Sequence, residues 1–286
     1  MLRLDRDLSV AVHRFSRELD GQGRLRIPIL MYHGIRDGVG SRHAYFETNT
    51  SPALFSRQMQ FLRDHKYNTL DLGEAVKALS GGDGGRRQVV ITFDDGYRDF
   101  YTNALPILAK HSFKATVFIV SGLIDKQLAS KIERQVMTWD EVREVHSNGI
   151  DVGSHTATHP QLYRLKSSLL ENEIRQSKRT IEDTLGEAVR SFSYPFAFPE
   201  HDRKFIRTLR DLLTMHGYEN GVSTIIGTAG RNHDRFFLPR LPVNSYDDPP
   251  LFQAKLEGGY DWLHYPQNFY KRLKGNVALR AIRGRE

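Results

Sequence analysis

The sequence predicts an α/β protein and favours a (β/α) barrel over an open sheet. The chain has 286 residues, which exceeds the commonest domain size but suits a single α/β barrel. Short runs of β-branched or aromatic residues alternate with helical patterns, which indicates a mainly parallel sheet covered by helices. About seven or eight such units fit within roughly 220 residues, as a barrel requires. In either architecture we expect the chemistry on loops that follow the carboxyl ends of the strands.

The predicted strands are short apolar runs bounded by turn-forming residues. In chain order they are Ile27–Tyr32, Tyr67–Leu70, Gln88–Phe93, Ala115–Val120, Gly149–Gly153, Ser191–Pro195, Val222–Ile226 and Phe236–Val243.

Recognisable end signals bound the helices that we expect between these strands. Ser51 followed by Pro52 predicts an N-cap and a first helical position, and the spacing of Asp71–Glu74 and of Thr138–Glu141 predicts two capping boxes. The longer predicted helices are Ala53–His65, Leu162–Leu185 ending at Gly186, and Lys204–His216 ending at Gly217.

The composition is that of a folded globular protein, with 39% hydrophobic and 26% charged residues. The longest strongly apolar stretch, Ala115–Ile124, is about half the ~20 residues that a membrane helix needs, so no transmembrane span is expected. The chain contains no cysteine, which excludes disulfides, thiolate zinc sites and a cysteine nucleophile. Any bound metal must therefore be held by His, Asp and Glu.

The formal net charge is +7, and most of it lies at the end of the chain. Residues 271–286 hold six Lys or Arg and one Glu, a difference of five, and are expected to form a solvated end. Nucleic-acid binding is not expected, because no such motif accompanies the charge. The first 27 residues lack the apolar core of a signal peptide, which predicts a cytoplasmic chain. We divide the chain into an N-terminal arm (1–26), a barrel domain (27–250) and a basic C-terminal extension (251–286).

Two segments carry residues suited to metal chemistry. The predicted strand Gln88–Phe93 is followed by two adjacent carboxylates, Asp94 and Asp95, and then by Gly96. A turn permitted by Gly96 can aim both carboxylates into one crevice, where a bound cation would relieve their repulsion. An Asp-Gly turn of purely structural origin is the alternative reading of this segment.

The second segment, Asp151–Pro160, also follows a short apolar strand and contains His155 and His159. Two histidines four residues apart can bring their imidazoles to one side. One carboxylate and two imidazoles make the three-ligand set of a catalytic zinc site, which leaves an open position for water. The remaining carboxylate is then available as a general base.

The Thr92–Gly96 and His155–His159 motifs, together with Leu30–Gly34 and Thr138–Ser154, resemble the polysaccharide deacetylase family, also called the NodB-homology or carbohydrate esterase family four domain, and its exopolysaccharide-type members in particular. The similarity runs from about Ile27 to Tyr246. It implies a distorted barrel of about seven strands and a divalent-metal hydrolase that removes acetyl groups from a glycan. The expected ion is Zn²⁺, although the donors also suit Co²⁺, Ni²⁺ or Mn²⁺.

The resemblance also implies roles for individual residues. Asp94 corresponds to the catalytic base, and Asp95, His155 and His159 correspond to the metal ligands. The family stabilises the oxyanion with the backbone N–H of the aromatic residue after a proline, which is Phe196 here. Tyr194 is among the aromatic residues whose rings could stack on a sugar.

The sequence departs from the family pattern in two places. Members often carry an arginine two residues before the proline to hold the base, whereas this chain has Ser193; Arg190 and Arg240 are the candidate substitutes. Many members also present a general-acid histidine near the end of the domain, and Leu238–Val243 contains none. His33, His201, His233 and His264 are alternatives, of which His33 is best placed because it follows the first predicted strand.

Three functions remain open on the sequence alone. The leading hypothesis is a metal-dependent deacetylase that acts on N-acetylated amino-sugar residues of a polysaccharide or oligosaccharide. The same site could instead belong to an amidase or cyclic-amide hydrolase that acts on a small molecule. A glycan-binding protein without turnover is the third hypothesis, because the general acid is unassigned.

Overall fold

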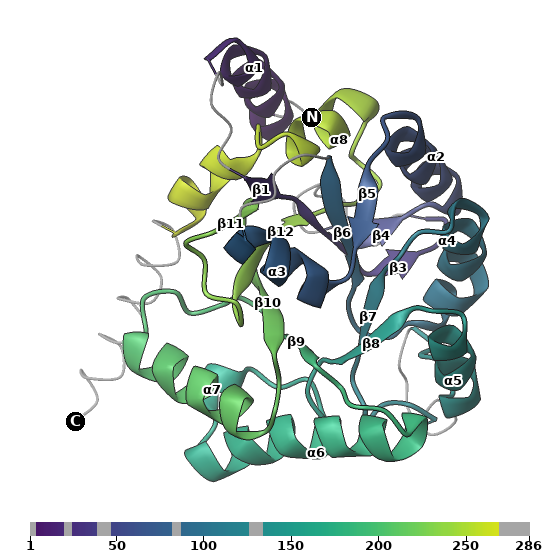
Figure 1. Ribbon diagram of the computed structural model, residues 1–286, viewed down its shortest axis with the longest axis vertical. Helices are drawn as coiled ribbons and strands as arrows, with labels where there is room; N and C mark the ends of the chain where they lie inside the picture. The colour runs from purple at the N-terminus through teal and green to yellow at the C-terminus, as the bar shows by residue number, and fades with distance from the viewer. Residues whose placement is uncertain (1–3, 20–24, 39–46, 82–86, 126–133, 269–286) are drawn as a thin grey trace.

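The computed structural model describes residues 4–19, 25–38, 47–81, 87–125 and 134–268 (Figure 1). Its strands are β1 Arg26–Ile27, β2 Ile29–Tyr32, β3 Gly34–Ile35, β4 Asn49–Thr50, β5 Asn68–Leu70, β6 Gln88–Phe93, β7 Thr116–Ile119, β8 Asp151–Ser154, β9 Ser191–Ser193, β10 Asn220–Ile226, β11 Ala229–Gly230 and β12 Leu238–Pro242. Its helices are α1 Leu4–Leu19, α2 Pro52–Asp64, α3 Leu72–Gly81, α4 Leu105–His111, α5 Trp139–Ser147, α6 Ser167–Leu185, α7 Arg203–Met215 and α8 Pro249–Leu256, with short turns η2 Phe100–Ala104, η4 Leu162–Arg164 and η5 Asp261–Leu263.

Parallel strands close into a barrel in the order β2-β12-β10-β9-β8-β7-β6. Closure comes from the pairing of β2 with β6, in which Ile29 lies opposite Val90 and Tyr32 opposite Phe93. The short strand β5 pairs with the first residues of β6 beside the barrel. The prediction of a (β/α) barrel of about seven strands is confirmed, and helices surround the barrel as expected (Figure 1).

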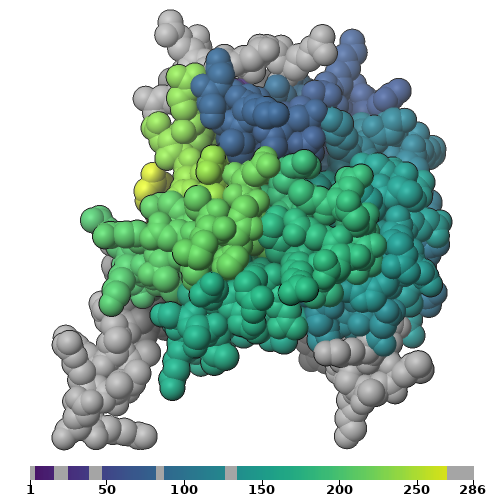
Figure 2. All heavy atoms as spheres, turned by 60° about the horizontal axis from the view of Figure 1, so that its bottom comes forward, coloured from purple at the N-terminus to yellow at the C-terminus, as the bar shows by residue number. Residues whose placement is uncertain are grey.

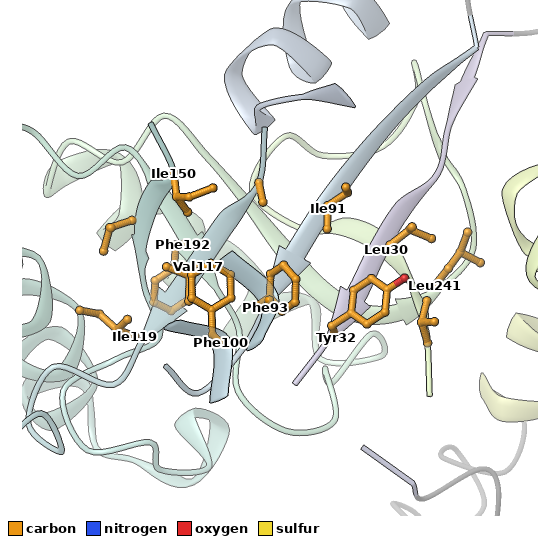
Figure 3. Packing of buried hydrophobic residues seen from close by; sticks show 14 of the residues in the cluster. Leu30, Tyr32, Ile91, Phe93, Phe100, Val117, Ile119, Ile150, Phe192 and Leu241 are labelled. Atoms are coloured by element: carbon orange, nitrogen blue, oxygen red, sulfur yellow. The ribbon is translucent and has the colours of Figure 1, made fainter. Parts of the chain in front are cut away.

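Alternate residues along the barrel strands fall into two separate apolar clusters, as the two-residue period of a strand requires. One cluster contains Leu30, Ile91, Val117 and Phe192, which pack beneath the surrounding helices (Figure 3). The other contains inward-facing residues such as Val90, Phe118, Val222 and Leu238.

Helix α3 contributes Leu72, Ala75 and Leu79 to the inward-facing cluster. It contacts β1, β5 and β10 and lies across the barrel in Figure 1. The amino-terminal end of the barrel is therefore covered by α3, and the carboxyl-terminal end remains for a site.

The predicted helix starts are confirmed where a cap defines them. Ser51 Oγ accepts a hydrogen bond from Leu54 N at 3.2 Å, with Pro52 at the first helical position of α2. Both capping boxes are present, at Asp71–Glu74 and at Thr138–Glu141. Each cap satisfies backbone N–H groups that have no partner inside the helix.

The long helix predicted to begin at Leu162 begins five residues later. Leu162–Arg164 forms the separate 3₁₀ turn η4, and Leu165 and Lys166 are extended before α6 starts at Ser167. The interruption lets Leu162 reach the core, where it is fully buried. The predicted end is confirmed, because Gly186 takes the left-handed conformation (φ 72°) that glycine adopts at a helix end. Helices α6 and α7 lie on the face shown in Figure 2.

Both ends of the described chain pack against the barrel domain. Residues 4–19 of the predicted arm form α1, which contacts α8 and places His13 Nε2 2.8 Å from Glu257 Oε2. The predicted domain boundary at 250 falls inside α8, whose Leu251 and Phe252 are buried. The basic residues 271–286 lie outside the described part of the chain. Among the helices that the structure describes, none has the length and hydropathy needed to cross a bilayer.

Candidate active site

The two adjacent carboxylates sit where β6 ends. Asp94 is 3% exposed, and its backbone N–H donates to Tyr32 O at 3.0 Å. Asp95 (φ 74°) and Gly96 (φ 67°) then take left-handed conformations, which turn the chain sharply. A Cβ on Gly96 would lie 2.9 Å from Ile119 Cγ2, so the turn requires glycine. This turn directs both carboxylates toward the carboxyl-terminal end of the barrel.

His155 follows β8 and is held in one orientation. Its backbone N–H donates to Ile119 O at 2.9 Å, and its Nδ1 lies 2.9 Å from Ser193 O. A carbonyl oxygen can only accept, so Nδ1 carries the proton and Nε2 presents its lone pair. A metal-ligating histidine commonly has this kind of partner on its other nitrogen.

His155, His159 and Asp95 converge on one point. Asp95 Oδ1 is 3.6 Å from His155 Nε2 and 3.5 Å from His159 Nε2, and the three donor atoms lie within 4.8 Å of one another. Donors about 2.0–2.2 Å from a tetrahedral ion are about 3.4 Å apart, so the three side chains fit a divalent metal. Burial, together with His155, lowers the pKa of His159 to about 4, which keeps its ring in the neutral form that ligates metals.

Asp94 is bound by Arg240 in a bidentate pair inside the barrel. Arg240 Nη1 donates to Asp94 Oδ1 at 2.8 Å and Nη2 donates to Oδ2 at 2.7 Å, while Ser193 Oγ donates to Oδ1 at 3.1 Å. Burial opposes ionisation, but the charge of Arg240, aided by His155 and the hydrogen bonds, lowers the pKa of Asp94 well below its usual value. Asp94 is therefore ionised at neutral pH although it is buried.

Arg240, and not Arg190, stands beside the buried carboxylate. Arg240 is 1% exposed, and its Nε donates to Ser223 O at 2.9 Å. Arg190 has a side chain that is 61% exposed and pairs with Glu219 at 3.3 Å. Ser193, which sequence reasoning treated only as a missing arginine, contacts both Asp94 and His155. Its position on the inward face of β9, two residues after Ser191, is the sequence signal that could have found it.

Of the alternative histidines, His33 lies at this site. It follows β2, and its Nε2 is 3.9 Å from Asp94 Oδ2, with 22% of the side chain exposed. His233 instead accepts from Gly230 N, and His264 pairs with Glu200. His201 is exposed just before α7. The strand pairings explain the placement of His33, because β2 lies between β6 and β12, which carry the Asp94–Arg240 pair.

The two aromatic residues predicted for this site have different surroundings. Phe196 takes a left-handed conformation (φ 59°), is 46% exposed, and its ring centroid lies 4.6 Å from that of His159. Tyr194 is 1% exposed and packs edge-on against Phe198 in the core. This burial corrects the expectation that the Tyr194 ring is available to a substrate. Strand alternation explains it, because Tyr194 follows β9 on the same outward face as Phe192.

The chain is similar in sequence and in fold to known polysaccharide deacetylases. A family model described as polysaccharide deacetylase matches residues 81–220. The Bacillus subtilis (strain 168) protein YxkH, assigned by name to the polysaccharide deacetylases, is 30% identical over 233 residues, 81% of this chain and 76% of its own length. Poly-beta-1,6-N-acetyl-D-glucosamine N-deacetylase of Staphylococcus aureus (strain MSSA476) is 21% identical over 68% of each chain. The Streptococcus pyogenes deacetylase PplD, solved in complex with acetate, has a TM-score of 0.71 and 28% identity, covering 82% of this chain and 99% of PplD.

The closed barrel, the matching family model and the relatives define a hydrolase of the (β/α)-barrel class. The chain belongs to the polysaccharide deacetylase family, and it is an enzyme of that family.

Proposed function

We propose that the enzyme removes N-acetyl groups from amino-sugar residues of a polysaccharide or oligosaccharide, with a divalent ion bound by Asp95, His155 and His159. The observation that carries this proposal is the convergence of these three donors beside an ionised, buried Asp94. The names of the relatives support the substrate class, since one is an N-deacetylase of poly-N-acetylglucosamine and another was solved with acetate.

Zn²⁺ is the ion that we propose, because one carboxylate and two imidazoles form the ligand set of catalytic zinc; Co²⁺, Ni²⁺ and Mn²⁺ accept the same donors. When bound, such an ion polarises the acetyl carbonyl and makes coordinated water more acidic. His155 and His159 supply neutral imidazoles and Asp95 supplies a negative charge, so the ion retains part of its charge for this purpose.

Asp94 is proposed to accept the proton of the water that attacks the acetyl carbon. Arg240 keeps Asp94 ionised and fixes both carboxylate oxygens, so the base is oriented before substrate arrives. Negative charge then develops on the carbonyl oxygen, and the backbone N–H of Phe196 is proposed to donate a hydrogen bond to it.

His33 is proposed to protonate the departing amine. Its Nε2 lies 3.9 Å from Asp94 Oδ2, which places an imidazole next to the base. When the C–N bond breaks, the nitrogen takes a proton from the imidazolium form of His33, and the proton that Asp94 took from water returns to His33, so the products are acetic acid, which ionises to acetate, and a free amine. This assignment fills the role of the histidine that is missing from Leu238–Val243.

The test combines metal analysis of the purified enzyme with acetate release from a panel of acetylated oligosaccharides. We expect a divalent ion bound at one per chain, and acetate release that His159→Ala abolishes. Ammonia or a carboxylate released from a cyclic amide, with no acetate from any glycan, would support the amidase alternative. Binding of acetylated glycan without any release would support the non-catalytic alternative.

A further inference from the structure

The loop that carries His159 has an unfavourable backbone conformation. Two residues with side chains, Thr156 (φ 70°) and His159 (φ 58°), lie in the left-handed region within four positions. Such conformations persist where surrounding contacts hold them. Thr156 Oγ1 accepts from His159 N at 2.9 Å, which is a contact inside the loop.

One carboxylate from outside the loop binds three of its donors. Glu173 lies on α6, and its Oε2 accepts from Ala157 N at 2.9 Å and from Thr158 N at 2.8 Å. Its Oε1 accepts from Thr158 Oγ1 at 2.7 Å. A carboxylate suits this place because it only accepts, and its two oxygens together offer about four lone-pair positions.

The opposite side of the same loop is bound by the segment that follows β7. Ser121 N donates to Thr156 O at 3.3 Å, and Gly122 N donates to Ala157 O at 2.8 Å. A Cβ on Gly122 would lie 2.5 Å from Ala157 O, so this approach requires glycine. The loop is thus held between backbone N–H groups on one side and the Glu173 carboxylate on the other.

The two histidines depend on this loop to different degrees. His155 precedes the left-handed residues and is bound by Ile119 O and Ser193 O, with a side chain that is 3% exposed. His159 comes after Thr156–Thr158, and its side chain is 25% exposed. The position of His159 relative to Asp95 therefore depends on the loop backbone, whereas that of His155 depends on the barrel.

We propose that Glu173 is a positioning residue of the metal site, which acts through the loop backbone to keep His159 Nε2 3.5 Å from Asp95 Oδ1. This inference rests on the proposed function, because it assigns Glu173 to the binding of the same ion. It concerns His159 alone and makes no demand on His155.

Glu173→Gln tests the proposal, with divalent affinity of the metal-free protein measured by competition between Zn²⁺ binding and a chromophoric chelator. The variant keeps the shape of the side chain but turns one acceptor oxygen toward the loop into an NH₂ donor. We expect Zn²⁺ affinity to fall about 10- to 100-fold, the usual effect of losing such a supporting contact. Glu171→Gln is the matched control, because Glu171 lies on the same helix and pairs with His216 instead. The Zn²⁺ affinity of this variant is expected to equal that of wild type.

A second pair of variants separates positioning from general stabilisation. In a His159→Ala background, Glu173→Gln is expected to cause no further loss of Zn²⁺ affinity, because its effect passes through His159. A purely structural role would lower the melting temperature of the metal-free protein while leaving the affinity of the folded protein unchanged, and that result would overturn the proposal. Thr158→Val, which deletes one of the three bonds and keeps the carboxylate, is expected to give a smaller loss and serves if Glu173→Gln fails to fold.

Zn²⁺ binding by the wild-type enzyme distinguishes failure of the Glu173 assignment from failure of the proposed function. If the wild-type enzyme binds Zn²⁺ and Glu173→Gln binds it equally well, the assignment of Glu173 is wrong and the proposed function stands. If wild type binds no divalent ion, both are overturned.

Discussion

The barrel carries an inward-facing carboxyl group at each end, and the pKa values of these two groups are shifted in opposite directions. At the carboxyl end, Asp94 is buried against the guanidinium of Arg240, and its pKa lies well below the usual range despite the cost of burial. At the amino end, Asp151 is half-buried and accepts hydrogen bonds from the hydroxyls of Thr116 and Ser191, at 3.3 and 3.4 Å. Burial, with a contribution from nearby Asp71, raises the pKa of Asp151.

The difference teaches that the partner of a carboxyl group, and not burial alone, decides the direction in which its pKa shifts. The comparison also shows that a cavity and the candidate metal donors lie at opposite ends of the barrel. A cavity of about 970 Å³ lies at the amino end and is lined by Asp151, Asn220 and the start of α3. Its rim charges neutralise one another, as Lys114 with Glu74 and Arg190 with Glu219 show. The donors that can hold a metal meet at the other end.

The largest effect is expected from removing a metal donor at the carboxyl end. His155→Ala deletes one of three ligands and should weaken binding of the ion so far that the purified variant carries no metal, so acetate release should fall to background. Metal analysis and an acetate assay check both. His146→Ala is the matched control, because His146 lines the amino-end cavity. Loss of acetate release in that variant would contradict the conclusion that the chemistry takes place at the carboxyl end alone.

The two carboxyl groups themselves form the next test. Asp94→Asn should lower kcat by about 10²–10⁴-fold, the usual contribution of a general base, while the metal content stays at the wild-type level. Asp151→Asn should leave kcat near the wild-type value, because Asp151 lines the amino-end cavity and the candidate metal donors lie at the other end of the barrel. Steady-state kinetics on an acetylated oligosaccharide measure kcat for both variants. Equal losses of kcat would contradict the conclusion that Asp94 takes part in catalysis and Asp151 does not.

Removing the guanidinium should make Asp94 resemble Asp151. Arg240→Met leaves the carboxyl group buried without a cation, which should cost about 3–5 kcal/mol of unfolding free energy at pH 7. In wild type the lowered pKa of Asp94 stabilises the fold above about pH 3.9 and this stabilisation is lost only as the pH falls toward the folded-state pKa. In the variant the pKa of Asp94 is raised, so protonation relieves the cost and the difference from wild type should be smaller at pH 4 than at pH 7.

Urea unfolding at the two pH values measures this effect. Arg190→Met removes the other candidate arginine, which forms an exposed pair with Glu219, and should cost less than about 1 kcal/mol. Equal losses in the two variants would show that the buried pair has no special role in stability.

The smallest expected effect is a gain in stability from Asp151→Asn. Because the pKa of Asp151 is raised in the folded state, the folded protein binds more protons than the unfolded chain between about pH 3.9 and the folded-state pKa. Stability therefore falls as the pH rises through this window. The amide removes that loss, so the variant should be slightly more stable than wild type at pH 7 and equal to it below pH 3.9, as urea unfolding can measure. Lower stability at pH 7 would mean that the ionised carboxylate is favourable there.

The sequence alone determined the features that depend on residues close together in the chain. These are the strand that ends at Phe93, the turn at Gly96 and the two capping boxes. They follow from the two-residue period of a strand, from the conformations open to glycine and from contacts within four residues. The meeting of Asp95 with His155 and His159 was also predictable, because parallel strands in one barrel bring their carboxyl ends together.

Tertiary structure decided which distant residues complete the site. Arg240 contacts Asp94 across 146 positions, and His33 reaches it because β2 pairs with both β6 and β12. The burial of Tyr194 and the binding of the His159 loop by Glu173 likewise depend on how strands and helices pack. Local patterns act over a few residues, whereas barrel closure and strand register select partners from the whole chain. The sequence therefore favoured His33 by its place after a strand but could not choose between Arg190 and Arg240.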